Sequence, residues 1–188
     1  MATSTLSRKA ATRGSRGFSL LELMFTLTVA GILLGIGVPS FVEIVRSNRT
    51  AANINELSTA FSIARSEAIR RGAPVTVCRS SDGELCGDDW ADGWIVFVDT
   101  AATETADPVV DTILQVWGEM SGDAAVATFA NGAASDIEWV RFGGRGSART
   151  SAAMPLTLEI ELAGCSGQQQ RILELNTVGR ASVARAAC

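Results

Sequence analysis

Few of the side chains in this sequence could perform covalent or acid–base chemistry. The 188 residues include four Cys and twenty Asp or Glu but no His, and the only Lys is Lys9. Without His there is no Ser-His-Asp triad, no Cys-His pair and no His-ligated metal. Without a later Lys there is no Schiff-base or P-loop lysine. Carboxylates are plentiful, yet the sequence marks out no pair of them for hydrolysis. We therefore expect a binding or structural protein rather than an enzyme, and no cofactor.

The four cysteines predict disulfide bonds. Cys78, Cys86, Cys165 and Cys188 follow a long apolar segment, and an even number of Cys in an oxidising compartment favours disulfides. Three pairings exist. Local pairing is the simplest, with Cys78–Cys86 closing a short acidic loop and Cys165–Cys188 tying back the C-terminus. We expect no zinc site, because the sequence has no CxxC and no His.

Acidic residues crowd the loop between the first two cysteines and beyond. They do not fit an EF-hand, because Cys86 takes the fifth position and Gly93 the twelfth. We predict a solvated loop and no metal, with a calcium site as the alternative. The acids are Asp82, Glu84, Asp88, Asp89 and Asp92.

An uncharged stretch of twenty residues runs from Leu23 to Val42. As a helix it spans about 30 Å, the thickness of a bilayer core. Residues 1–17 carry four basic residues and no acid, so the positive-inside rule places the N-terminus in the cytoplasm and the C-terminal part across the membrane. These basic residues are Arg8, Lys9, Arg13 and Arg16.

The segment Gly17-Phe18-Ser19-Leu20-Leu21-Glu22, between a basic leader and an apolar helix, resembles the processing site of type IV pilins and type II secretion pseudopilins. The resemblance implies that a prepilin peptidase cleaves after Gly17 and methylates the new N-terminal Phe18. It also gives Glu22 a role in assembly and makes Pro39 a helix-kinking proline. A carboxylate in an apolar segment is costly unless paired, so Glu22 would pair with a neighbouring subunit's N-terminal amine.

A second set of segments is similar to the GspH/FimT group of minor pilins and pseudopilins. It comprises Ala64–Arg71, Pro74–Cys78, Gly93–Asp99 and the terminal Gly179-Arg180. The resemblance implies a structural subunit that primes or caps a type IV pilus or a type II secretion pseudopilus. The implied partners are other minor pilins or pseudopilins, the inner-membrane assembly platform, the prepilin peptidase and the membrane.

Periodicity predicts an α+β fold, and the resemblance implies that it is pilin-like: a long N-terminal helix, transmembrane in its first half, packed on an antiparallel β domain. We expect a cleaved leader (1–17), a helix (18–71) with a transmembrane part at about 20–42, and a periplasmic β domain (72–188). Apolar or small residues at three-to-four spacing form the inner helix stripe: Phe41, Ile44, Val45, Ala52, Leu57, Phe61, Ala64 and Ala68. The expected strands are Val75–Arg79, Trp94–Asp99, Thr112–Trp117, Ala125–Phe129, Ile137–Phe142, Leu156–Leu162, Arg171–Leu175 and a short one near Ala181–Ala184.

The alternative function is that of a DNA receptor at a pilus tip, a role the FimT branch implies through its C-terminal basic motif. Here Arg180 matches that motif and Arg185 is the next cation, while Arg145 and Arg149 lie in a segment that we expect to be a flexible loop with Arg141. Against DNA, the chain without its leader has twelve basic and twenty acidic residues, a net charge of −8. The aromatic side chains are expected in the core and at its rim rather than on a base-stacking platform.

Overall fold

The computed structural model describes residues 17–101, 103 and 106–188, so the leader residues 1–16 lie outside the described part. The chain divides into two units between Phe41 and Val42, within the single long helix α1 (Leu20–Arg71). Acids and bases lie where the helix dipole favours them, with Glu22 in the first turn and Arg70 and Arg71 in the last.

The first unit contributes residues 17–41 to the described part. Large apolar side chains are exposed from Phe18 to Phe41, and Phe25 and Leu33, for example, are 69% and 66% exposed. The hydroxyls of Thr26 and Thr28 donate to the carbonyls of Leu23 and Met24, each at 2.8 Å, as expected for hydroxyls inside an apolar helix. Among the described residues, α1 is the one helix long and apolar enough to cross a membrane. It stays helical through Pro39.

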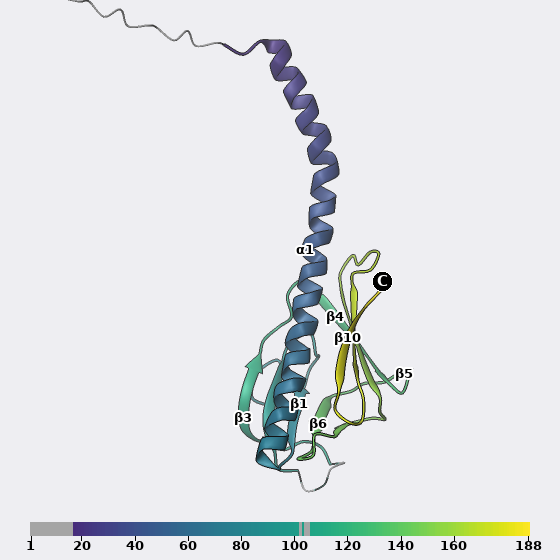
Figure 1. The fold of residues 1–188 in the computed structure, drawn as a ribbon. Helices are drawn as coiled ribbons and strands as arrows, with labels where there is room; N and C mark the ends of the chain where they lie inside the picture. The colour runs from purple at the N-terminus through teal and green to yellow at the C-terminus, as the bar shows by residue number, and fades with distance from the viewer. Residues whose placement is uncertain (1–16, 102, 104–105) are drawn as a thin grey trace, which may run out of the picture. The chain divides into compact units, whose positions relative to one another are not determined.

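The second unit contains two antiparallel five-stranded sheets. The first has the order β3-β2-β1-β6-β7, and the second β10-β9-β8-β4-β5. Figure 1 shows β3 on one side of the C-terminal part of α1 and β10 on the other. The strand bounds are β1 Val75–Arg79, β2 Trp94–Asp99, β3 Val110–Trp117, β4 Ala124–Ala130, β5 Ala133–Ala134, β6 Trp139–Phe142, β7 Ala148–Thr150, β8 Leu156–Leu162, β9 Gln170–Leu175 and β10 Ala181–Ala186. The α+β prediction is confirmed.

Two features of this sheet arrangement differ from the prediction. The short strands β5 and β7 were not expected. The segment predicted as a flexible loop is instead the β6–β7 hairpin, with Arg141 directly opposite Arg149. Strand β7 has only three residues, Ala, Arg and Thr, so it carries no recognisable alternation of apolar and polar residues.

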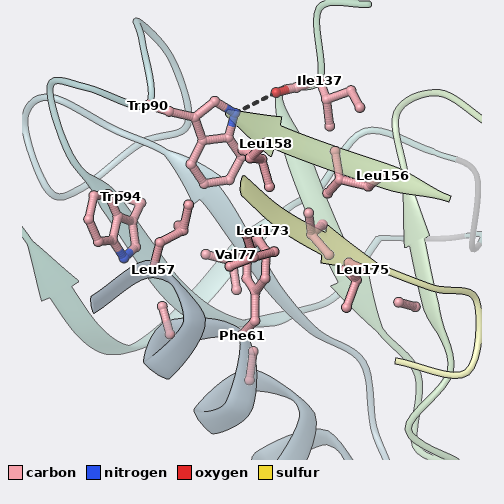
Figure 2. Close-up of a cluster of buried hydrophobic side chains, with 14 of the residues drawn as sticks. Leu57, Phe61, Val77, Trp90, Trp94, Ile137, Leu156, Leu158, Leu173 and Leu175 are labelled. Carbon is pink, nitrogen blue, oxygen red and sulfur yellow. Dashed lines mark hydrogen bonds between the residues drawn. The ribbon is translucent and has the colours of Figure 1, made fainter. Parts of the chain in front are cut away.

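The core of the second unit lies between α1 and both sheets. Leu57 and Phe61 from α1 pack with Val77 of β1, Leu158 of β8 and Leu173 of β9, as Figure 2 shows. Burial of each such side chain contributes about 1.5–3 kcal/mol. Trp90, which the sequence did not single out, lies edge-on to Phe61, and its Nε1 donates to the carbonyl of Ile137 at 2.6 Å (Figure 2).

The buried stripe of α1 is shifted from the predicted one. Ile54 and Ala60 are buried, whereas Ala52 and Ile44 are exposed. The reason is the helical repeat: positions 54, 57, 61, 64 and 68 keep a three-to-four spacing, and position 52 lies off that line. Most of the predicted aromatic core residues are buried, and Trp117 and Phe129 are half-buried at its rim, as predicted. The buried ones are Trp94, Phe97, Trp139 and Phe142.

Candidate functional site

The predicted processing site lies at the exposed start of the described chain. Gly17, Phe18 and Ser19 precede α1, and Phe18 is 75% exposed. The helix begins just after them, where the N–H of Leu23 donates to the carbonyl of Ser19 at 3.1 Å. Glu22 is exposed in the first turn of α1, where the helix dipole favours a carboxylate. The peptide bond after Gly17 is thus accessible, and an exposed carboxylate lies one helical turn beyond it.

Two disulfides fasten the second unit. Cys78, in β1, bonds to Cys86, and Cys165, after β8, bonds to Cys188, after β10. These are the local pairs of the sequence analysis. The second bond closes the open end of the β8–β9–β10 meander, and the N–H of Cys188 also donates to the carbonyl of Gly167 at 3.1 Å.

The acidic loop folds around its own carboxylates. Asp82 Oδ1 accepts the backbone N–H groups of Glu84 (2.8 Å) and Leu85 (3.0 Å) and the hydroxyl of Ser80 (3.1 Å). The backbone donors are the main reason why the pKa of Asp82 lies below its ordinary value. Asp88 accepts from the hydroxyl of Ser81. Within the described ranges, no three acids or Cys converge as metal ligands would.

A buried ion pair joins β2 to β6. Asp99 Oδ2 lies 2.6 Å from both Nε and Nη2 of Arg141 and accepts the Thr76 hydroxyl at 2.6 Å. The Arg141 guanidinium also lies over the ring of Trp139, 4.6 Å from its centroid. Burial raises the pKa of Asp99, but these donors and the N–H groups of Ala101 and Val109 outweigh it, so the net pKa lies below the ordinary value.

A second junction joins α1 to two turns. The Arg65 side chain donates to the carbonyls of Gly146 (Nε, 3.2 Å) and Val178 (Nη2, 3.0 Å). Gly146 and Gly179 both have positive φ, and a Cβ on Gly179 would lie 2.1 Å from the Gly146 carbonyl oxygen. Only glycine fits this contact without a shift of the backbone.

Two of the four arginines predicted to contact DNA lie together at this junction. Arg145 and Arg180 are each next to one of the two touching glycines, and both are exposed. Arg149 lies on β7 instead, and Arg185 lies near the far end of β10. Five residues of strand separate Arg180 from Arg185, about 17 Å. The four arginines therefore do not form one patch.

Sequence reasoning missed the roles of Arg65 and Arg141. Arg65 appeared only as part of a resemblance, and Arg141 was placed in a flexible loop. The sequence did contain a signal for the buried pair. Asp99 directly follows the apolar run of β2, and a carboxylate buried there needs a partner for its charge. Nothing in the sequence indicated which of the arginines that partner would be.

Comparison with known proteins adds to this geometry. The family model described as type II transport protein GspH matches residues 53–179, well over half of the chain. The chain belongs to this family. The model of the prokaryotic N-terminal methylation motif matches residues 12–38, which include Gly17, Phe18 and Glu22.

Individual relatives agree with the family. The chain is similar to the pilin-like protein PilA1 of Thermus thermophilus, with 37% identity over 95 residues. The match covers 50% of this chain and 54% of that protein, so the chain spans about half the length of this curated relative. Two crystal forms of the type IV minor pilin FimU of Pseudomonas aeruginosa share the fold. Their TM-scores are 0.56 and 0.52 at 19% and 18% identity, covering 73% and 71% of this chain and 89% and 91% of the FimU chains.

Membership of this family supports a structural role as a pilus or pseudopilus subunit. The methylation motif and the exposed apolar half of α1 indicate that it is anchored in a membrane.

Proposed function

We propose that this chain is a minor subunit that primes or caps its fibre and waits in the inner membrane as a single-pass protein before assembly. Its N-terminus lies in the cytoplasm and residues 72–188 in the periplasm. The prepilin peptidase cleaves between Gly17 and Phe18, and the new Phe18 amine is methylated. The partners are other minor pilins or pseudopilins and the inner-membrane assembly platform.

The main support for this proposal is the exposed apolar stretch around Glu22. From Phe18 to Val42 the single charged side chain is Glu22, and the apolar side chains around the described helix are exposed. Such a surface needs lipid before assembly and neighbouring helices afterwards. Inside a bundle of helices an unpaired carboxylate would cost several kcal/mol. Glu22 would therefore select the neighbour position that supplies a Phe18 amine. A minor role is supported by the shared fold of FimU, which is described as a minor pilin.

Crosslinking of Glu22→Ala tests the assembly role. The variant should insert into the membrane as well as the wild type or better, because a charge leaves an apolar segment. Its crosslinking to other minor subunits should fall, since the neighbouring amine loses its partner. Glu43→Ala, which removes an exposed carboxylate beyond the apolar stretch, is the matched control and should crosslink normally. Equal crosslinking of Glu22→Ala and wild type would remove the pairing role.

DNA binding is the second candidate, and the junction of the two turns is the observation that favours it. Arg145 and Arg180 expose two cations beside touching backbone turns, and Arg65 lies beneath them on α1. Arginines in such a position contact phosphates without regard to sequence. The acids of residues 72–138, thirteen against the single base Arg79, would confine any DNA to this end of the unit.

A further inference from the structure

A separate group of arginines lies where α1 meets the other end of β9 and β10. Arg171 of β9 is 4% exposed, and its Nη2 donates to the Ser47 hydroxyl of α1 at 3.0 Å. Arg185 of β10 is the direct cross-strand neighbour of Arg171. Arg46, next to Ser47 on α1, donates through Nη1 to the carbonyl of Gly164 at 2.9 Å. We call Arg46, Arg171 and Arg185 the arginine cluster.

The positive charge of the cluster is not neutralised within the described chain. In the part that the structure describes, the ion pairs between side chains involve other arginines, and Arg171 donates only to neutral oxygens. Directly opposite residues of an antiparallel pair share a face, so Arg171 and Arg185 repel each other. Burial and the charge of Arg185 both lower the pKa of Arg171. A buried cation that faces a second cation is energetically costly, and a nearby anion would lower that cost.

The position of the cluster along α1 suggests where that anion comes from. Val42 is the last residue of the uncharged stretch, and Arg46 follows it by four positions, about one helical turn. Lipid phosphates lie at this level of a membrane, just beyond the hydrocarbon core. Glu43 is on the same turn but is exposed and forms no ion pair with the cluster in the described residues.

We propose that the arginine cluster binds the phosphate of an anionic phospholipid headgroup, which docks the folded unit on the membrane before assembly. Exposed Arg185 and half-buried Arg46 supply N–H donors, and buried Arg171 supplies charge behind them. Arginine forks suit phosphate oxygens in both shape and charge. The inference rests on the proposed membrane anchoring of α1. The inference adds a lipid-binding site to that anchor. When the subunit leaves the membrane to join a fibre, these headgroup contacts would break.

Thermal unfolding of the full chain in lipid nanodiscs tests the site. All four Trp residues lie in the unit Val42–Cys188, so Trp fluorescence reports on that unit alone. Nanodiscs of phosphatidylcholine are compared with nanodiscs containing about 30% phosphatidylglycerol. The anionic lipid should raise the Tm of the wild type by about 3–6 °C. Arg185→Gln should lose most of this rise, and in pure phosphatidylcholine its Tm should stay equal or increase, because repulsion of Arg171 is removed.

Arg180→Gln is the matched control, since it removes an exposed arginine from the opposite end of β10 and should keep the full rise. Arg46→Gln should behave as Arg185→Gln does. The site is overturned if all variants keep the rise, or if the wild type shows none. It is also overturned if about 10 mM inorganic phosphate in phosphatidylcholine, or a DNA duplex, gives the same Arg185-dependent rise. A chain that fails to enter nanodiscs at all contradicts the anchoring proposal instead.

Discussion

Removal of one partner of the buried Asp99–Arg141 pair should strongly destabilise the second unit. Both side chains are buried, with 0% and 3% of their surfaces exposed. Asp99→Asn keeps the shape of the side chain but removes the carboxylate charge that lies against the buried Arg141 guanidinium. Loss of one partner of a buried pair costs about 3–5 kcal/mol. For a unit of this size that corresponds to a fall in Tm of about 6–20 °C.

The assay is unfolding of the full chain in detergent, followed by Trp fluorescence. Asp136→Asn is the control, because Asp136 also pairs with an arginine, Arg79, but is 72% exposed. Its loss should stay below about 1 kcal/mol. Combining Asp99→Asn with Arg141→Met should recover part of the loss, because the guanidinium charge is then removed together with that of Asp99. A fall for Asp99→Asn no larger than that for Asp136→Asn would refute the reasoning.

The same pair predicts a pH dependence with a definite sign. The pKa of Asp99 is lower in the folded chain than its ordinary value of 3.8. Its contribution is therefore fully present above the unfolded pKa and is lost as the pH falls through the lower folded pKa. The stability difference between wild type and Asp99→Asn should be constant near neutral pH and shrink progressively below about pH 4. A difference that grows on acidification would contradict this.

Three further outcomes are expected. Gly17→Leu should leave a full-length membrane-bound precursor, and N-terminal sequencing that finds Phe18 as the first residue would contradict the processing site. In urea unfolding, Gly179→Ala should lower the free energy of unfolding more than Gly132→Ala does. Both glycines have positive φ, so both substitutions strain the backbone, but only at Gly179 would the new Cβ clash with neighbouring backbone. If the chain binds duplex DNA, the slope of log K against log salt should fall by about two in Arg145→Ala/Arg180→Ala, and an unchanged slope would exclude these contacts.

Much of the fold could be predicted because its signals are local. The helix end at Arg71 follows from two cations, Gly72 and a nearby proline, and Gly72 indeed has a φ of 64°. The bounds of β1, β2 and β8 match those predicted, because each is a dense apolar or alternating run. Strand β5 could not be found, since two alanines carry no period.

The junctions of the second unit could not be predicted, because they join residues far apart in sequence. Asp99 and Arg141 are 42 positions apart, and Arg65 reaches a carbonyl 113 positions away. Each partner is one of many arginines in the sequence. Only the pairing of β1 with both β2 and β6 brings Asp99 and Arg141 together. The disulfide pairs, by contrast, could be predicted from the sequence, because the local pairing was the simplest of the three possible ones.

The residues at these junctions maintain the fold, and other residues would set the properties of an individual subunit. A Cβ on Gly93 would lie 2.6 Å from the Trp117 carbonyl oxygen, Asp99 balances a buried arginine, and Gly179 touches a neighbouring turn. Each of these residues holds two distant segments together, so a chain that shares the fold has reason to keep them whatever fibre it joins. The features that would distinguish this subunit lie outside those contacts. They are the acidic loop closed by Cys78–Cys86 and the arginine cluster, which joins α1 to β9 and β10. Selection of partners and of lipid would act on these surfaces, while the motif residues keep the scaffold that presents them.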